Sequence, residues 1–161
     1  MVSIEKIASM NPWWSKGSDF AGLDSDLLAY NSERSVIKFE RLPSFYSVLK
    51  PGMIYLLKGP RRVGKTLLLK LLIKKLLDEN VQQEDIFYFS FDTITTSKEL
   101  DNMLRDFLSK PPAGIKYIML DEVQSVNGWE NVVKALYDAG MLANAVTIAT
   151  GSIAHLLKQE M

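Results

Sequence analysis

A glycine-rich stretch that begins at Gly59 combines residue types that bind phosphate. The predicted phosphate-binding residues are Gly59, Pro60, Arg61, Arg62, Val63, Gly64, Lys65, Thr66 and Leu67. From Gly59 to Thr66 they match the pattern of glycine, any four residues, glycine, lysine and then serine or threonine. The glycines let the backbone turn tightly and point its N–H groups at phosphate oxygens. We expect Lys65 to act as a catalytic point charge on the β- and γ-phosphates, and Thr66 to offer its hydroxyl to Mg²⁺.

Two adjacent acids follow an apolar run further along the chain. Residues 117–120 are apolar and precede Asp121 and Glu122, which is typical of a buried parallel strand that ends in carboxylates. Ligands of open α/β sheets bind at the carboxyl ends of the strands, where a phosphate loop also lies. The pattern therefore predicts that Asp121 supports Mg²⁺ and that Glu122 polarises an attacking water. A solvated strand end without chemistry is the alternative.

A third polar group closes another apolar run. Residues 145–149 are followed by Thr150, Gly151 and Ser152. The hydroxyl of Thr150 or of Ser152 is placed to touch the γ-phosphate or the attacking water, and the residues leave a purely structural turn open as the alternative. His155 is the only histidine, and we assign it no chemistry.

The elements that must position these residues alternate along the chain. Apolar runs at residues 53–57, 86–91, 117–120 and 145–149 predict buried strands, and helical patterns follow the first three of them. Strands that alternate with helices predict the α/β class, with a mainly parallel sheet between layers of helix.

Two helix starts carry capping signals. Thr96 with Glu99 forms a capping box, and Asn127 with Glu130 predicts a second cap three residues ahead of an acid. Gly140 is a plausible end for the second of these helices.

The helix after the glycine-rich loop is leucine-rich on nearly every side, which indicates burial against the sheet. Lys70, Lys74 and Asp78 recur every four residues and are expected to form its solvated stripe. A basic nucleic-acid patch of Lys70, Lys74 and Lys75 is the alternative, and a solvated face is favoured over it.

The first fifty residues show little periodicity and are predicted to form an arm (1–50) that packs on a core (51–161). We expect a short helix at 3–9, a helical turn at 26–30 and an edge strand at 35–39. Trp13 and Trp14 follow Pro12 and are expected to pack the arm onto the core, with contact to a bound base as the alternative.

Composition excludes several classes of protein. The 161 residues contain 19 basic and 19 acidic side chains and no cysteine, so charge does not indicate a nucleic-acid partner, and neither disulfides nor thiol catalysis is available. No apolar run approaches the roughly 18 residues of a membrane span. The N-terminus lacks the features of a signal peptide, so we expect a cytoplasmic protein without a membrane partner.

Taken together, these motifs make the chain similar to P-loop ATPases whose catalytic glutamate follows the Walker B aspartate, the AAA-like branch. It most resembles a family of archaeal and bacterial AAA-type ATPases. The residues that carry the resemblance are Asn11-Pro12-Trp13-Trp14, the loop from Gly59 to Thr66, Leu120-Asp121-Glu122-Val123-Gln124 with Trp129, and Thr150-Gly151-Ser152.

The resemblance implies a three-layer α/β/α sandwich whose sensor strand lies between the loop strand and the Walker B strand. It implies that Lys65 and Thr66 bind ATP and Mg²⁺, that Asp121 supports the metal, that Glu122 activates water, and that Thr150 or Ser152 is a polar sensor. It also implies a helical lid and a C-terminal domain. The chain has no segment that corresponds to the lid, so we expect a shortened form whose arginine finger, if one is used, comes from a neighbouring copy in a homo-oligomer.

Three functions are therefore compared. An ATP-hydrolysing domain is favoured by the joint presence of both motifs. A nucleotide-dependent binding switch, in which ATP orders residues 93–97 or 124–128, is the alternative. A small-molecule kinase is disfavoured because the arginines do not cluster and because adjacent Asp121 and Glu122 suit water activation better.

Overall fold

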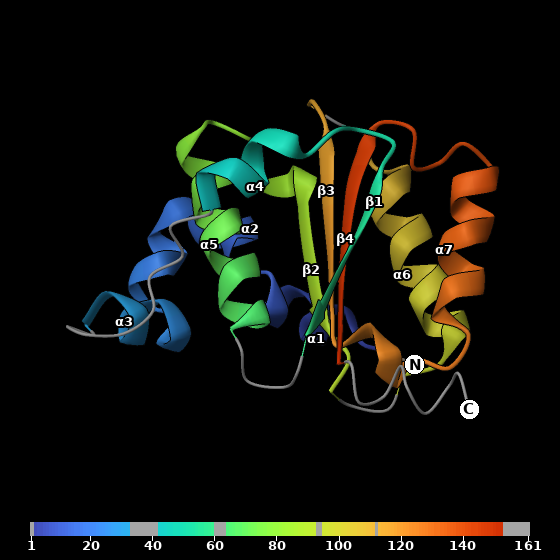
Figure 1. Cartoon of the computed structure of the whole chain (residues 1–161), viewed down its shortest axis with the longest axis horizontal. Coiled ribbons are helices and arrows are strands. Elements are labelled where there is room, and N and C mark those ends of the chain that lie inside the picture. Colours follow the sequence, from blue (N-terminus) through green and yellow to red (C-terminus); the bar gives the residue numbers. More distant parts are fainter. Residues whose placement is uncertain (1, 33–41, 60–63, 93–94, 112, 153–161) are drawn as a thin grey trace.

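The computed structural model describes residues 2–32, 42–59, 64–92, 95–111 and 113–152 (Figure 1). Within them, a four-stranded sheet has the order β1-β4-β3-β2. The strands are β1 (Ile54–Gly59), β2 (Ile86–Ser90), β3 (Lys116–Asp121) and β4 (Ala145–Ser152). All neighbouring strands are parallel. This confirms the predicted α/β class, and β4 lies between β1 and β3 as the resemblance implies.

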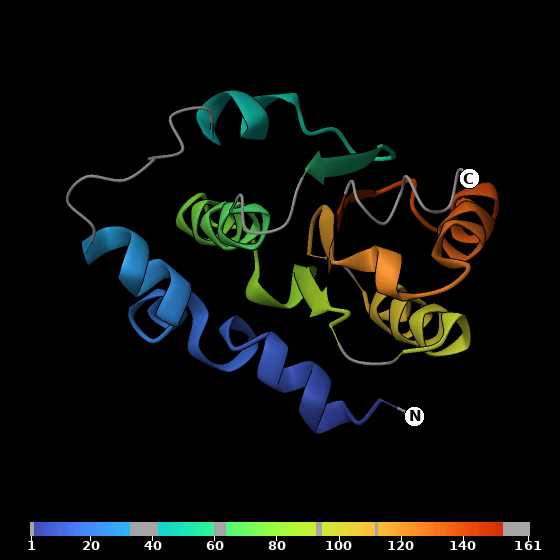
Figure 2. The same ribbon diagram turned by 60° about the horizontal axis from the view of Figure 1, so that its bottom comes forward.

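Helices cover both faces of the sheet and give three layers (Figure 1). One face carries α4 (Leu42–Val48) and α5 (Lys65–Asp78), and the other carries α6 (Ser97–Ser109) and α7 (Trp129–Asp138). The first helices are α1 (Ile4–Met10), α2 (Trp13–Lys16), the 3₁₀ helix η1 (Gly17–Gly22) and α3 (Ser25–Ser32). Figure 2 shows them running beside β2 and α5. Among the residues described, no helix combines the length and apolar character needed to cross a membrane.

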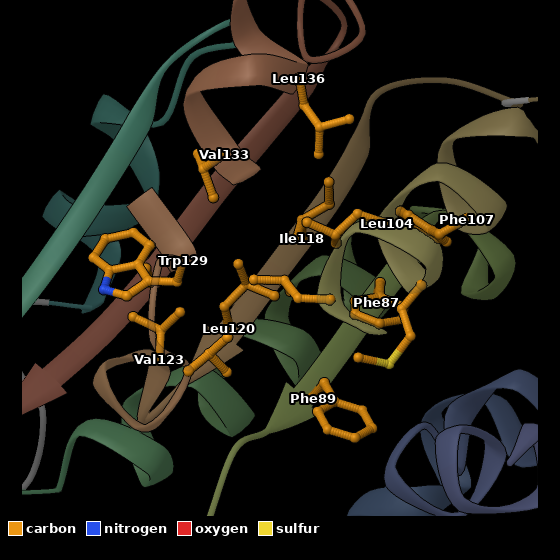
Figure 3. Packing of buried hydrophobic residues seen from close by; sticks show 14 of the residues in the cluster. Phe87, Phe89, Leu104, Phe107, Ile118, Leu120, Val123, Trp129, Val133 and Leu136 are labelled. Atoms are coloured by element: carbon orange, nitrogen blue, oxygen red, sulfur yellow. The ribbon is translucent and has the colours of Figure 1, made fainter. Parts of the chain in front are cut away.

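Apolar side chains fill the space on both sides of the sheet because successive strand residues point to opposite faces. On β2, Phe87 and Phe89 pack with α6 and α7, whereas Ile86 and Tyr88 pack toward α5. Figure 3 shows the first of these cores, where Phe107 of α6 lies beside Phe87 with ring centroids 5.2 Å apart. The continuous aromatic run of β2 is therefore that of a strand buried on both faces.

The capping signals are half confirmed. At α6, Thr96 accepts from the Glu99 N–H at 3.2 Å, and the Glu99 carboxylate accepts from the Thr96 N–H at 3.1 Å. The prediction that Asn127 caps α7 is wrong, because Gly128 occupies the N-cap with φ 83° and no side chain caps the helix. The 3₁₀ helix η3 (Val123–Ser125) and the left-handed turn at Gly128 shift the helix start by one residue.

Side chains of the N-terminal arm form hydrogen bonds with the backbone of β2 along its outer edge. The Asn11 amide accepts from the Tyr88 N–H at 2.7 Å and donates to the Tyr88 carbonyl at 2.8 Å. The indoles of Trp13 and Trp14 both donate to the Ile86 carbonyl, at 3.0 and 2.7 Å. Trp13 is 2% exposed. The expectation that the tryptophans pack the arm onto the core is confirmed, and Asn11 stands in for a neighbouring strand.

Strand β1 is less covered than predicted. Tyr55 and Leu57 pack against the α5 core, but Ile54 and Leu56 on the opposite face are each 37% exposed, and Met53 before them is 51% exposed. The prediction of a fully buried strand is therefore wrong for one face, because β1 is an outer strand of the sheet within the described residues.

The solvated stripe of α5 is only partly confirmed. Lys74 pairs with Asp78 at 3.0 Å on the surface, as expected. Lys70 instead pairs with Asp24 at 2.9 Å and Asp26 at 2.6 Å, both next to or within α3, so it ties the arm to the core. The predicted strand at 35–39 and His155 lie outside the described residues.

Candidate functional site

The carboxylate of Asp121 is the centre of the site at the carboxyl ends of the strands. It lies at the end of β3, is 1% exposed, and accepts three hydroxyl hydrogen bonds. Its Oδ2 accepts from Thr66 Oγ1 and from Tyr88 Oη, each at 2.7 Å, and its Oδ1 accepts from Thr150 Oγ1 at 2.6 Å. Hydrogen bonds to an ionised acceptor are short and strong. Side chains from the start of α5 and from strands β2 and β4 therefore all bond the buried carboxylate at the end of β3.

The loop before α5 is described at its two ends. Gly59 ends β1 and is buried. Gly64 has φ 88° and is the N-cap of α5, a conformation that glycine adopts without strain. Lys65 begins the helix, and its Nζ donates to the Gly59 carbonyl at 2.8 Å. The predicted residues Pro60, Arg61, Arg62 and Val63 lie outside the described residues.

Glu122 follows Asp121 in an unusual backbone conformation. Its φ of 56° and ψ of 44° are left-handed, which costs a non-glycine residue roughly 1–3 kcal/mol and is concentrated at functional sites. Its N–H donates to Thr150 Oγ1 at 2.9 Å. Its carboxylate accepts from Gln124 Nε2, and Gln124 is 5% exposed. The turn after β3 thus fixes both the backbone and the side chain of Glu122.

A cavity of about 240 Å³ opens in front of these groups. Its described lining residues are Asp26, Gly64, Lys65, Thr66, Leu67 and Glu122. Five predicted site residues, Gly64, Lys65, Thr66, Leu67 and Glu122, are therefore brought to one space. Asp121 and Thr150 lie behind this surface, since they are 1% and 0% exposed. Ser152 ends β4, and its side chain lies outside what the structure describes.

Sequence reasoning missed three side chains of this region. Tyr88 holds Asp121, Gln124 holds Glu122, and Asp26 of α3 lines the cavity. A signal for Tyr88 was available, because a buried tyrosine needs a partner for its hydroxyl. Burial, followed by the negative charge of Asp121, raises the pKa of Tyr88, so the phenol stays protonated and acts as a donor.

The donor set suits a small hard cation. Oxygen atoms of the Thr66 hydroxyl and the Asp121 carboxylate lie 2.7 Å apart, and Thr66 faces the cavity. Among the described residues, no three His, Cys, Asp or Glu gather as a metal-binding cluster. Magnesium fits this arrangement, because it is commonly held by one or two protein oxygens together with water and substrate phosphates.

Comparisons with known proteins identify a matching family and two relatives. A family model described as an AAA domain matches residues 52–161. An uncharacterised protein of Haemophilus influenzae is 28% identical over 113 residues, which are 67% of this chain and 27% of that protein. An uncharacterised protein of Methanocaldococcus jannaschii is 32% identical over 117 residues, 70% of this chain and 24% of that protein. The chain thus spans about a quarter of the length of these two relatives.

Two solved structures are also similar to the chain. A closed-state reconstruction of Hsp104 with ATPγS and casein has a TM-score of 0.49 and 14% identity, and covers 81% of this chain and 25% of that chain. The structure of PCH-2 from C. elegans has a TM-score of 0.45 and 14% identity, and covers 89% of this chain and 39% of that one.

Proposed function

The chain belongs to the AAA domain family, and from this premise we propose that it binds ATP with Mg²⁺ and hydrolyses the γ-phosphate bond. The observation that carries the proposal is the convergence of Lys65, Thr66 and Glu122 on one cavity, with Asp121 hydrogen-bonded behind Thr66. The start of α5 and the second of the two adjacent acids, which are distant in sequence, line the same cavity. This is the arrangement that phosphoryl transfer to water requires.

Binding is assigned to the loop and the start of α5. The free N–H groups of the first helical turn and the positive end of the helix dipole attract phosphate oxygens. Lys65 Nζ, which donates to the Gly59 carbonyl, is close enough to the cavity to exchange this partner for phosphate oxygens. Thr66 and Asp121 would hold Mg²⁺. When bound, the ion supplies positive charge at the phosphate oxygens.

Hydrolysis is assigned to Glu122. A water in the cavity attacks the γ-phosphorus in line, the bond from phosphorus to the bridging oxygen breaks, and the proton of the water passes to the Glu122 carboxylate. Gln124 donates to Oε2 of that carboxylate and so orients it, which leaves Oε1 to accept from the water. The left-handed backbone at Glu122 directs the side chain out of the line of the strand.

Thr150 is assigned a positioning role. Its hydroxyl donates to Asp121 and accepts from the Glu122 N–H, so a single side chain of β4 holds both acids in register. A contact of Thr150 with phosphate as a sensor stays a prediction. The residue is 0% exposed, and its hydroxyl already makes these two hydrogen bonds. The sensor role of Ser152 is likewise still a prediction.

Turnover is expected to be slow in the isolated chain. Arg105 pairs with Asp101 on α6 at 2.9 Å, away from the cavity-lining residues. The other arginines lie outside the described residues. An arginine supplied by a neighbouring copy would accelerate hydrolysis by about 10³–10⁵-fold, so a homo-oligomer in the cytoplasm is the working form that we propose. Protein or nucleic-acid partners stay open.

A nucleotide-dependent binding switch is the second candidate. Gln124 couples the Glu122 carboxylate to the turn that leads into α7, so a movement of Glu122 toward a bound nucleotide would pull on residues 124–128. Hydrogen exchange of residues 95–97 and 124–128 with and without ATP tests this candidate. Equal protection in both states counts against it.

The first experiment is calorimetric titration of Mg²⁺ and ATP into the chain and into Lys65→Ala. Loss of binding in Lys65→Ala, with binding retained in Lys74→Ala, supports the proposal. Lys74 is a matched control because it lies on the same helix and pairs with Asp78 on the surface. Binding that is equal in all three proteins would contradict the assigned site.

The second experiment separates hydrolysis from binding. Glu122→Gln keeps the shape of the side chain but removes the proton acceptor. We expect it to bind Mg-ATP and to lose about 100-fold or more of turnover, the typical contribution of a general base. Unchanged turnover would contradict the role of Glu122 as proton acceptor.

A further inference from the structure

We propose that Tyr88 is a positioning residue for the metal-binding carboxylate of Asp121, and that Asn11 of the N-terminal arm fixes Tyr88 in place. The inference rests on the proposed function, because it concerns the same Mg²⁺ site. It adds to that function a dependence of the site on a segment that lies outside residues 52–161, the part of the chain that matches the AAA domain model.

The first step is the contact between Tyr88 and Asp121. Tyr88 Oη donates to Asp121 Oδ2 at 2.7 Å, and the same oxygen accepts from Thr66 Oγ1 at 2.7 Å. If the Thr66 oxygen binds a metal ion, its hydrogen would still donate to Asp121 Oδ2. The hydrogen bond from the Tyr88 hydroxyl therefore keeps Asp121 Oδ2 in position to accept from Thr66.

The second step is the strand register. Tyr88 pairs with Met119, and Ser90 pairs with Asp121. Residues two apart on a strand share a face, so the side chains of Tyr88 and Asp121 project toward α5 as diagonal neighbours. The long phenol spans this diagonal. A slip of β2 by one residue would turn Tyr88 to the opposite face and remove the contact.

The third step is the restraint on Tyr88 itself. Asn11 is 1% exposed, and its amide bonds both the N–H and the carbonyl of Tyr88. Its second amide hydrogen bonds the Ile7 carbonyl of α1 at 2.8 Å. The Tyr88 ring meets the Trp13 ring edge-on, with centroids 6.4 Å apart. The arm thus holds both the backbone and the ring of Tyr88.

The consequence is measurable at the metal rather than at the nucleotide. Loss of a partner that orients a metal ligand typically costs 10–100-fold in metal affinity. The phosphate-binding groups at the start of α5 do not contact Tyr88 through any hydrogen bond described here. Removal of the Tyr88 hydroxyl should therefore lower the affinity for Mg²⁺ and leave metal-free ATP binding in place.

The test measures ATP affinity by calorimetry at increasing Mg²⁺ and in excess EDTA. For Tyr88→Phe we expect a half-saturating Mg²⁺ concentration raised by about 10-fold or more, with the affinity in EDTA within about twofold of wild type. Tyr55→Phe is the matched control: its hydroxyl bonds the backbone of Lys50 and Val48 and should leave both values unchanged.

The arm is tested with Asn11→Ala against Trp14→Phe. Both remove hydrogen bonds to β2, but only Asn11 bonds Tyr88, so only Asn11→Ala should raise the Mg²⁺ requirement. If Asn11→Ala does not fold, Asn11→Asp, which keeps an acceptor for the Tyr88 N–H, is compared instead. A Mg²⁺ requirement equal to wild type in Tyr88→Phe overturns the positioning role, and one equal to wild type in the Asn11 variant overturns the role of the arm. Absence of Mg²⁺-dependent ATP binding in wild type overturns the proposed function itself, which the other outcomes leave standing.

Discussion

At the β2 side of the sheet, side chains of the N-terminal arm supply hydrogen-bond partners to the outer strand, whereas at the β1 side the apolar side chains of the outer strand lie partly exposed. Asn11 bonds both polar backbone groups of Tyr88, while Ile54 and Leu56 of β1 are each 37% exposed. Outer strands with unpaired backbone groups invite pairing with other chains. The covered side is also the one that contributes a hydroxyl to the site.

The difference teaches that covering an outer strand does not require another strand. One amide side chain makes the two bonds that a neighbouring residue of a strand would make, and two indoles share the next carbonyl. Because these groups belong to the arm, the stability of β2 depends on packing of residues 11–14. Strand β1 contacts a different part of the arm, since the Tyr55 hydroxyl bonds Lys50 and Val48, and its opposite face is partly exposed at Ile54 and Leu56. Four measurements test this contrast.

The largest effect is expected from Trp13→Ala. Trp13 is 2% exposed, contacts Phe20 at 5.2 Å between ring centroids and donates to Ile86. We expect a loss of about 3–5 kcal/mol in the free energy of unfolding, typical of a buried tryptophan, measured by urea denaturation. Ile4→Ala, at an 85% exposed position of the same arm, should change it by less than about 0.5 kcal/mol. Equal effects would show that the arm is not part of the cooperative core.

The next comparison sets Leu56 on β1 against Leu120 on β3. Leu120 is 0% exposed, so Leu120→Ala should cost about 2–5 kcal/mol of unfolding free energy. Leu56 is 37% exposed, and Leu56→Ala should cost less than about 1 kcal/mol because little area is withdrawn from water. A similar cost at both positions would mean that another surface covers β1 in solution.

A smaller effect is expected from the ion pair that joins the arm to α5. Burial lowers the pKa of Lys70, but hydrogen bonds to Asp26 and Asp24 outweigh it and raise the pKa overall. A raised lysine pKa stabilises the fold below the unfolded value of 10.5 and loses this contribution as pH rises through the folded value. The stability difference between wild type and Lys70→Met in urea unfolding, below about 1 kcal/mol, should therefore shrink as the pH rises above 10.5. A constant difference would indicate packing rather than charge.

The smallest change concerns one amide proton. The Tyr88 N–H donates to the Asn11 side chain, so its hydrogen exchange should be slow in wild type and in Trp14→Phe. Asn11→Ala should accelerate it by about tenfold, equivalent to about 1.4 kcal/mol for loss of one hydrogen bond. Unchanged exchange by NMR would show that another group protects this side of β2.

Local spacing predicts much of this molecule. The strands, the α6 capping box and the convergence of Lys65, Thr66 and Glu122 follow from apolar runs and from motifs only a few residues long. The position of β4 between β1 and β3 came from the family resemblance instead, because apolar runs do not encode the order of strands in a sheet.

The missed features are contacts between distant residues. Asn11 and Tyr88 are 77 residues apart, and Tyr88 and Asp121 are 33 apart, so no local pattern links them. Lys70 was expected in solvent because its helical spacing is polar, but an arm that bends back over α5 meets it. The misplaced cap at Asn127 has a local cause, since Gly128 accepts the left-handed turn that asparagine would adopt less easily.

The left-handed backbone of Glu122 places a residue proposed for hydrolysis at a position where other residue types would strain the backbone less. Glycine adopts this conformation at no steric cost, and asparagine tolerates it better than glutamate does. Variants such as Glu122→Gly would relieve this backbone strain, at the cost of the Gln124 hydrogen bond, and would lack the proposed proton acceptor. A screen for thermostable variants would therefore be expected to enrich proteins that lack the proposed proton acceptor at this position.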